Sequence, residues 1–352
     1  MKFLSGAGAL AITLAALSGC AAPPADPATG PSAAPGPQPL ASGELRWTVV
    51  TRPSMDLWYH GLAYTGFLGQ AAELPIHAPG YVARMVAAKQ SSGVHPTVLD
   101  RRAEEFRSLF EAGPRYSALH FLPLYFPTGE FFFGAMQAWV QVGGDARRIS
   151  DPALAQAVAF LSQQFPTEGE RRTLASWLEV LTEEGRVFYT AHRQQRAAQL
   201  AGVVPAVQAE WESLAPQLRP VLDYLLLTQG ELILSHPLGP EGRTLELGNR
   251  FNRIAVLMPD PTRPSDAVWA FLHELMYPFV NGVISDQLSP AQIRDTNQQL
   301  LSRRAAIRAA SAVLARVAPQ AVQPYREAHL RWAGVPVPAA AAERERAFIR
   351  AY

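Results

Sequence analysis

The chain has 352 residues, with 31 Lys and Arg against 30 Asp and Glu and a formal net charge of +1. This balance excludes a protein that is drawn to nucleic acid by an overall basic charge, and no nucleic-acid partner is expected. Its single cysteine, Cys20, excludes an intrachain disulfide.

The first residues form a short apolar stretch. Met1 and Lys2 are followed by small apolar residues over 3–17 and then by Leu17-Ser18-Gly19-Cys20. The stretch is too short to span a hydrocarbon core of about 30 Å comfortably, and helix-breaking prolines follow it. We therefore expect residues 1–19 to be a signal peptide that is removed on export.

The four residues Leu17-Ser18-Gly19-Cys20 resemble the lipobox of bacterial lipoproteins. The resemblance implies that Cys20 carries lipid and that the protein is anchored to a membrane of the cell envelope. Residue 22 is Ala rather than the Asp that resembles an inner-membrane retention signal. If the source is Gram-negative, we expect the outer membrane, facing the periplasm.

The residues after the lipobox divide into three predicted regions. Residues 20–43 contain the lipidated Cys20 and a stretch rich in Pro and Ala, which has almost no side chain large enough to pack and is expected to be a tether. A helical region is expected over 44–229, and a zincin-like region with short strands and helices over 230–352. The last assignment depends on the motif discussed below.

Hydrophobic periodicity predicts the elements in chain order. A weak alternation over 44–50 predicts a strand, and helical spacing follows from Met55 to about Thr228. Two apolar runs then predict strands, Glu231–His236 and Arg253–Met258, with a Gly-Pro-Glu-Gly turn at 239–242 between them.

Helices are predicted for the rest of the chain. Ser265 is a suitable N-cap for a helix over Ala267–Phe279, and Ser289 with Pro290 begins another. The latter carries apolar residues every seventh position, and its arginines are expected on the solvated surface: Ile293, Leu300, Ile307 and Leu314 against Arg294, Arg303, Arg304 and Arg308. Segments 319–332 and 339–352 complete a mainly helical α+β fold, with a small sheet next to the helix over 267–279.

One motif carries metal chemistry. His273-Glu274 followed by Phe279-Val280-Asn281 is similar to an uncharacterised bacterial family of zincin-like proteins whose helix reads H-E-x-x-H-x-F-V-N-P. The resemblance implies that His273 would bind zinc and that Glu274 would polarise the bound water. It also implies that the strand Arg253–Met258 is an edge strand that receives a peptide.

The chain departs from this pattern at the metal ligands. Tyr277 stands where the family has its second histidine, and a phenol must lose a proton to bind zinc well. The third ligand would come from further along the chain, where Glu327 and His329 are the nearest candidates. Two residues apart on a helix, they point in different directions. We therefore expect no metal, or only weakly bound zinc.

Three functions remain open. The favoured hypothesis is a membrane-anchored lipoprotein whose zincin-like domain is a pseudoenzyme that binds a protein or peptide. The first alternative is an active zinc peptidase in which His273 binds metal, Glu274 activates water, and Tyr277 binds metal or stabilises the oxyanion. The second is a helical envelope scaffold unrelated to zincins. The sequence thus leaves open whether the protein is an enzyme.

Other polar residues are less informative. Asp56 and His60, four residues apart, are interpreted either as an acid–base pair or, more simply, as a surface pair on a helix. His60, His192 and His236 are isolated in the sequence, so none of them is assigned to a site.

Overall fold

A computed structural model describes residues 45–68, 74–245, 252–287 and 298–352. In this part of the chain the strands form one four-stranded mixed sheet in the order β1-β2-β4-β3. The strands are β1 (Arg46–Thr51), β2 (Gln229–Ser235), β3 (Arg243–Leu245) and β4 (Asn252–Leu257). β1, β2 and β4 run parallel, while β3 pairs antiparallel with β4.

Helices occupy most of the sequence between β1 and β2. They are α1 (Pro53–Thr65), α2 (Tyr81–Ser91), α3 (Val98–Ala112), α4 (Gly129–Gln141), α5 (Pro152–Gln164), α6 (Glu168–Glu184), α7 (Thr190–Leu200) and α8 (Val203–Tyr224). Short helical turns lie between some of them: η1 (Pro114–His120), η2 (Leu122–Tyr125), η3 (Ala146–Arg148) and the π-helical η4 (Gly185–Tyr189). Thr97 and Thr167 begin α3 and α6 with capping boxes, which satisfy free N–H groups of the first turn.

The chain after β4 is helical. It forms α9 (Ser265–Gln287), α11 (Gln298–Val317), η5 (Pro319–Ala321), α12 (Val322–Trp332) and α13 (Ala341–Ala351). The mainly helical α+β fold with a small sheet is therefore confirmed. The predicted start of a helix at Ser289 and Pro290 lies outside the described residues.

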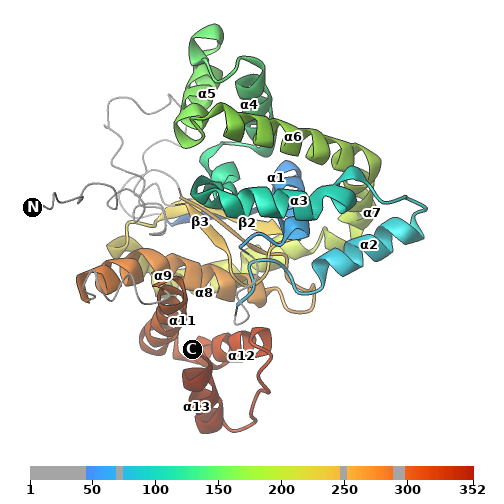
Figure 1. Cartoon of the computed structure of the whole chain (residues 1–352). Helices are drawn as coiled ribbons and strands as arrows, with labels where there is room; N and C mark the ends of the chain where they lie inside the picture. The colour runs from blue at the N-terminus through green and yellow to red at the C-terminus, as the bar shows by residue number, and fades with distance from the viewer. Residues whose placement is uncertain (1–44, 69–73, 246–251, 288–297) are drawn as a thin grey trace, which may run out of the picture.

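The sheet lies between two groups of helices (Figure 1). α1, α3 and α6 lie on one side, and α8 and α9 on the other, with α11 to α13 beyond them. Alternate residues of β2 point into the two cores: Leu232 and Leu234 join the core with α8 and α9, while Ile233 joins the core with α1, α4 and α6. Because both faces of the sheet are covered, β2 has consecutive apolar residues where a half-exposed strand would alternate apolar and polar ones.

The sheet arrangement corrects one expectation. The strand predicted at Arg253–Met258 is β4, which lies between β2 and β3 and is not an edge strand. Among the described residues β3 forms that edge, because the turn after β2 leads into a strand of three residues that pairs with β4. Such a short strand has too little periodicity to be recognised in the sequence.

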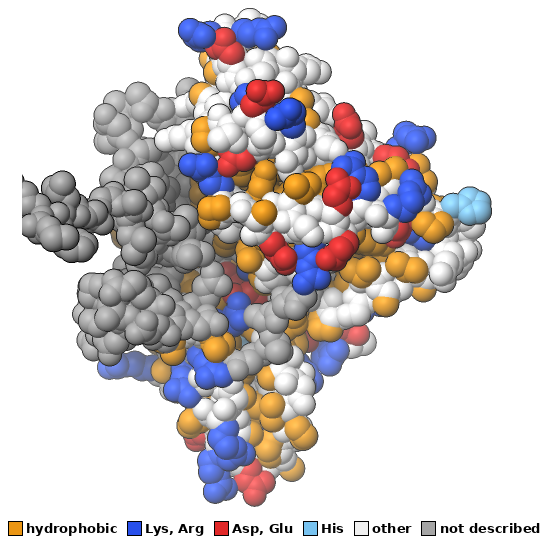
Figure 2. Space-filling model, viewed as in Figure 1, with side chains coloured by type: hydrophobic (Ala, Val, Ile, Leu, Met, Phe, Trp, Pro, Cys, Tyr) orange, Lys and Arg blue, Asp and Glu red, His pale blue; other side chains and the backbone are white. Residues whose placement is uncertain are grey.

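The surface reflects the near-neutral composition. Basic and acidic side chains are interspersed on the face shown in Figure 2. No helix in the described ranges combines the length and apolar character that a membrane crossing requires.

Candidate functional site

The site is built around α9, the helix that carries His273 and Glu274. This helix follows β4 after a turn and packs against β4 and β3. Its apolar residues enter the core, which leaves the side chains of His273 and Glu274 buried, with 0% and 2% of their surface exposed. Two polar groups at the interface of a helix and a sheet require partners, because unpaired buried polar groups cost free energy.

Glu274 finds its partners on the β3 side. The backbone N–H of Gly242 donates to Oε1 at 2.9 Å, and the hydroxyl of Thr244 donates to Oε2 at 2.6 Å. Burial raises the pKa of this carboxyl, but His273, Thr244 and the nearby Arg243 outweigh it and lower the pKa below its usual value. Glu274 is therefore held as a carboxylate with both oxygens engaged.

Glu241 also lies near Nε2 of His273 and is buried. The hydroxyl of Tyr277 donates to its Oε1 at 2.9 Å, and Nε of Arg303 on α11 lies 3.1 Å from its Oε2. Burial, followed by the charges of Glu241 and Glu274, raises the pKa of Tyr277 well above its usual value. Burial lowers the pKa of Arg303, but the charge of Glu241 outweighs it and raises the pKa overall. Tyr277 is thus a neutral hydrogen-bond donor, and Arg303 is a cation.

Three of these residues could hold a metal ion. Nε2 of His273 lies 3.2 Å from Oε1 of Glu274 and 3.8 Å from Oε2 of Glu241. One potential ligand atom from each residue lies within 4.8 Å of the others. An imidazole with two carboxylates is a donor set that zinc and other divalent transition metals accept.

The structure brings only part of the predicted site together. Tyr277 lies one turn after His273, with 6.2 Å between the ring centroids, but its hydroxyl is bonded to Glu241. His329 is buried with its ring 5.3 Å from that of His273, whereas Glu327 pairs with Arg344 at 2.7 Å. The expectation that Glu327 and His329 point in different directions is confirmed.

Two residues of this cluster, Glu241 and Arg303, are absent from the predicted site. The sequence places Glu241 in a turn and predicts Arg303 on the surface, yet Arg303 is only 7% exposed. The surface assignment of Arg303 is wrong, because this residue precedes the buried Ile307 by one turn and therefore shares its side of α11. The sequence offers one signal for Glu241 as a site residue: its acidic side chain stands in a Gly-Pro-Glu-Gly turn that precedes the HE motif.

Asp56 and His60 are also placed differently from the expectation. Both are buried on α1, so the surface-pair interpretation is wrong. His60 binds Glu184 through Nε2 at 3.0 Å, whereas Asp56 lies 3.6 Å from Arg193. They do not form an acid–base pair with each other.

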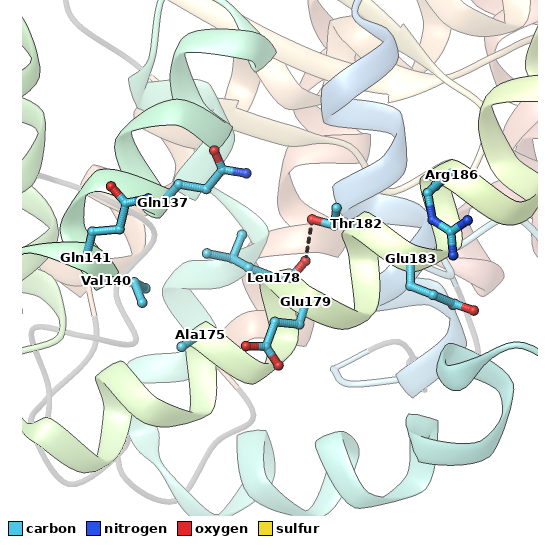
Figure 3. A pocket seen from close by; sticks show the side chains of 9 residues that line it. All are labelled: Gln137, Val140, Gln141, Ala175, Leu178, Glu179, Thr182, Glu183 and Arg186. Atoms are coloured by element: carbon cyan, nitrogen blue, oxygen red, sulfur yellow. Dashed lines mark hydrogen bonds between the residues drawn. The ribbon is translucent and has the colours of Figure 1, made fainter.

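A separate pocket of about 400 Å³ lies between α4 and α6 (Figure 3). Its lining includes apolar side chains such as Val140 and Leu178, but no residue of the Glu241–His273–Glu274 cluster. The hydroxyl of Thr182, at its edge, donates to the backbone carbonyl of Leu178 at 2.7 Å. This pocket therefore does not give access to the candidate metal centre.

Comparisons with protein-family models, with curated proteins and with solved structures find no match to this chain. The geometry at α9 therefore carries the functional argument by itself.

Proposed function

We propose that the protein is a lipid-anchored lipoprotein of the cell envelope whose zincin-like domain binds a protein or peptide and does not hydrolyse it. The observation that carries the non-hydrolytic part is the contact of Arg303 and Tyr277 with Glu241. The lipobox at Cys20 carries the anchoring.

Arg303 supplies the positive charge that a metal ion would bring to this site. The guanidinium lies against Glu241, and Glu241 lies against His273. A divalent ion bound to Glu241 would sit close to this cation in a poorly screened interior, where like charges repel strongly. The arginine therefore favours a metal-free state in which Glu241 is already neutralised.

Burial is a second argument against hydrolysis. A catalytic zinc site keeps one coordination position open for water or substrate. His273 and Glu274 are buried, and Glu274 already accepts hydrogen bonds from Gly242 and Thr244. A carboxylate with both oxygens engaged is poorly placed to take a proton from water.

The zinc-peptidase alternative has one observation in its favour, the close approach of Glu241, His273 and Glu274. In that case His273 and Glu241 would bind the metal, Glu274 would activate water, and Tyr277 would bind the metal or the oxyanion.

Metal analysis of the protein, purified without chelators, separates these functions. We expect far less than one zinc per chain and no cleavage of an unfolded protein substrate. A full equivalent of zinc, together with a Glu274→Gln variant that keeps the metal but loses proteolysis, would establish the peptidase instead. Peptide binding is tested by scanning a peptide library with the wild-type protein. If no peptide binds, the helical envelope scaffold is the favoured function.

A further inference from the structure

A second polar cluster lies at the carboxyl ends of the parallel strands. Asp56 is in the first turn of α1, directly after β1, and Ser235 and His236 mark the end of β2. Both Ser235 and the backbone of His236 lie beside the Asp56 carboxyl. The carboxyl ends of parallel strands are where α/β sheets commonly bind ligands. None of these residues belongs to the cluster at His273.

A small pocket opens at this edge of the sheet, and we call it the Arg196 pocket. It is lined by Tyr81, Met85, Tyr189, His192, Arg193, Arg196 and His236. Its volume of about 10 Å³ is enough for one water-sized group. His192 and Arg196 on α7 are only half-buried, so the pocket borders solvent at these two residues.

Positive charge exceeds negative charge around the Arg196 pocket. Arg193 lies 3.6 Å from Asp56, so this carboxylate offsets one arginine. Burial and the charges of Arg196, Arg193 and the nearby Arg84 lower the pKa of His236 to about 3. Arg196 thus faces a histidine that is neutral near pH 7 and cannot add to its charge.

The pocket wall contains buried hydrogen-bonding groups without partners. Nη1 of Arg193 and Nε2 of His192 make no hydrogen bond to any residue in the described ranges. The hydroxyl of Tyr189 accepts from that of Tyr81 and has no further partner in these ranges. Tyr189 is 3% exposed and ends η4, a π-helical turn of the kind often found at functional sites. Donors left unpaired at the wall of a pocket are suited to donate hydrogen bonds to a ligand oxygen.

A hydrogen-bonded network fixes the opposite wall. The Tyr81 hydroxyl lies 2.9 Å from Nδ1 of His60, and Nε2 of His60 lies 3.0 Å from Glu184. Lys89 in turn lies 2.9 Å from Glu184 and 2.7 Å from Asp100. The network holds Tyr81 in place without using the donors on α7.

We infer that the Arg196 pocket binds the anionic group of a small ligand, a carboxylate or a phosphate. Arg196 supplies the charge, because Asp56 offsets that of Arg193. Arg193, Tyr189 and His192 supply hydrogen-bond donors to the ligand oxygens. The body of the ligand extends past His192 and Arg196 toward solvent.

The test uses the full chain in detergent, labelled with ¹⁵N-histidine, with inorganic phosphate and acetate as probes. We expect the imidazole signals of His192 and His236 to shift and saturate at one site per chain, with the tighter probe showing which anion is preferred. Arg196→Gln should weaken that probe at least tenfold, which corresponds to about 1.4 kcal/mol. Tyr189→Phe should weaken it as well, while Arg172→Gln, on the exposed side of α6, should not.

The inference is overturned if neither probe saturates its binding site at concentrations up to about 20 mM, at which even a ligand with a Kd of about 1 mM would nearly fill the site. It is also overturned if Arg196→Gln and Arg172→Gln weaken binding equally, because that result indicates nonspecific screening. Should Arg196→Gln not fold, Tyr189→Phe against Arg172→Gln decides the question. Zinc content does not enter this test, so its outcome is independent of the proposed function.

Discussion

Arg303 on α11 places Nε 3.1 Å from Oε2 of Glu241, in a site where both side chains are almost completely buried. The residue that follows the HE motif by one turn, Tyr277, donates to the other oxygen of the same carboxylate. A cation and a phenol thus lie against an acid that, with His273, would otherwise be a metal ligand. This relationship underlies the first prediction.

Tyr277→His should raise zinc affinity, because it adds an imidazole on the His273 side of α9 and removes a hydrogen bond to Glu241. Combined with Arg303→Met, it should raise the affinity by about a further tenfold or more, since loss of supporting partners changes metal affinity on that scale. Competition against a chromophoric chelator measures both variants. Tyr277→Phe, which adds no ligand, is the control, and an affinity no higher in Tyr277→His than in Tyr277→Phe would contradict the zincin-like placement.

Lys89→Met should lower the free energy of unfolding by about 3–5 kcal/mol, because it leaves the buried Glu184 without its cation. Arg107→Met is the control, since Arg107 pairs with exposed carboxylates and should cost less than about 1 kcal/mol. Chemical denaturation followed by circular dichroism measures both. Equal losses in the two variants would show that the Lys89 network adds nothing to stability.

Gly242→Ala should destabilise the protein by about 1–3 kcal/mol, because an added Cβ would lie 2.7 Å from the carbonyl oxygen of Ala255 and 2.8 Å from Cγ of Glu274. Gly134→Ala, within α4, meets no atom within 4 Å and should stabilise the protein by about 0.5–1 kcal/mol. Thermal unfolding of the two variants gives opposite shifts of Tm if this is correct. A harmless Gly242→Ala would mean that β3 can move away from α9.

Acid should unfold the protein in a transition that takes up several protons. Burial is the largest cause that lowers the pKa of four histidines, to about 3 for His77 and His236 and well below the usual value for His120 and His329. Because the unfolded state protonates near pH 6.5, their stabilisation is complete above that pH and is lost as the pH falls. The loss approaches about 5 kcal/mol per pH unit for four groups at 1.36 kcal/mol each.

Asp56 opposes this trend, because burial raises its pKa from 3.8 to about 6 and makes the folded state bind a proton more tightly over that window. Denaturant titrations at pH 8, 7, 6 and 5 measure the net slope. His236→Gln should lower the slope by about one proton. A free energy of unfolding that stays constant from pH 7 to pH 5 would show that the histidines titrate normally.

Cys20→Ala should abolish incorporation of radiolabelled palmitate and leave the chain uncleaved at this position or released as a soluble form, because the thioether can no longer form. The measurement is labelling in cells, followed by carbonate extraction of membranes. If the variant remained in the membrane pellet with its signal removed, the lipoprotein assignment would be wrong.

The sequence by itself determined the class of fold and the order of its main elements. Apolar periodicity identified the helices on either side of β2, and the unbroken run in that strand fits burial on both faces. It also identified α9 and its His273-Glu274 pair, because the Pro-rich turn before this helix and the helical spacing within it are visible in consecutive residues. Because these features depend on residues only a few positions apart, they can be recognised in a short stretch of sequence.

Only the tertiary structure decided which side chains meet. Glu241 and Arg303 are 62 positions apart, and the packing of α11 against α9, which itself packs against β3, brings them together with Tyr277. Asp56 on α1 and Arg193 on α7 lie even further apart in the sequence, yet Nε of Arg193 lies 3.6 Å from Oδ2 of Asp56. Contacts of this kind arise from packing between elements, which no local sequence pattern contains.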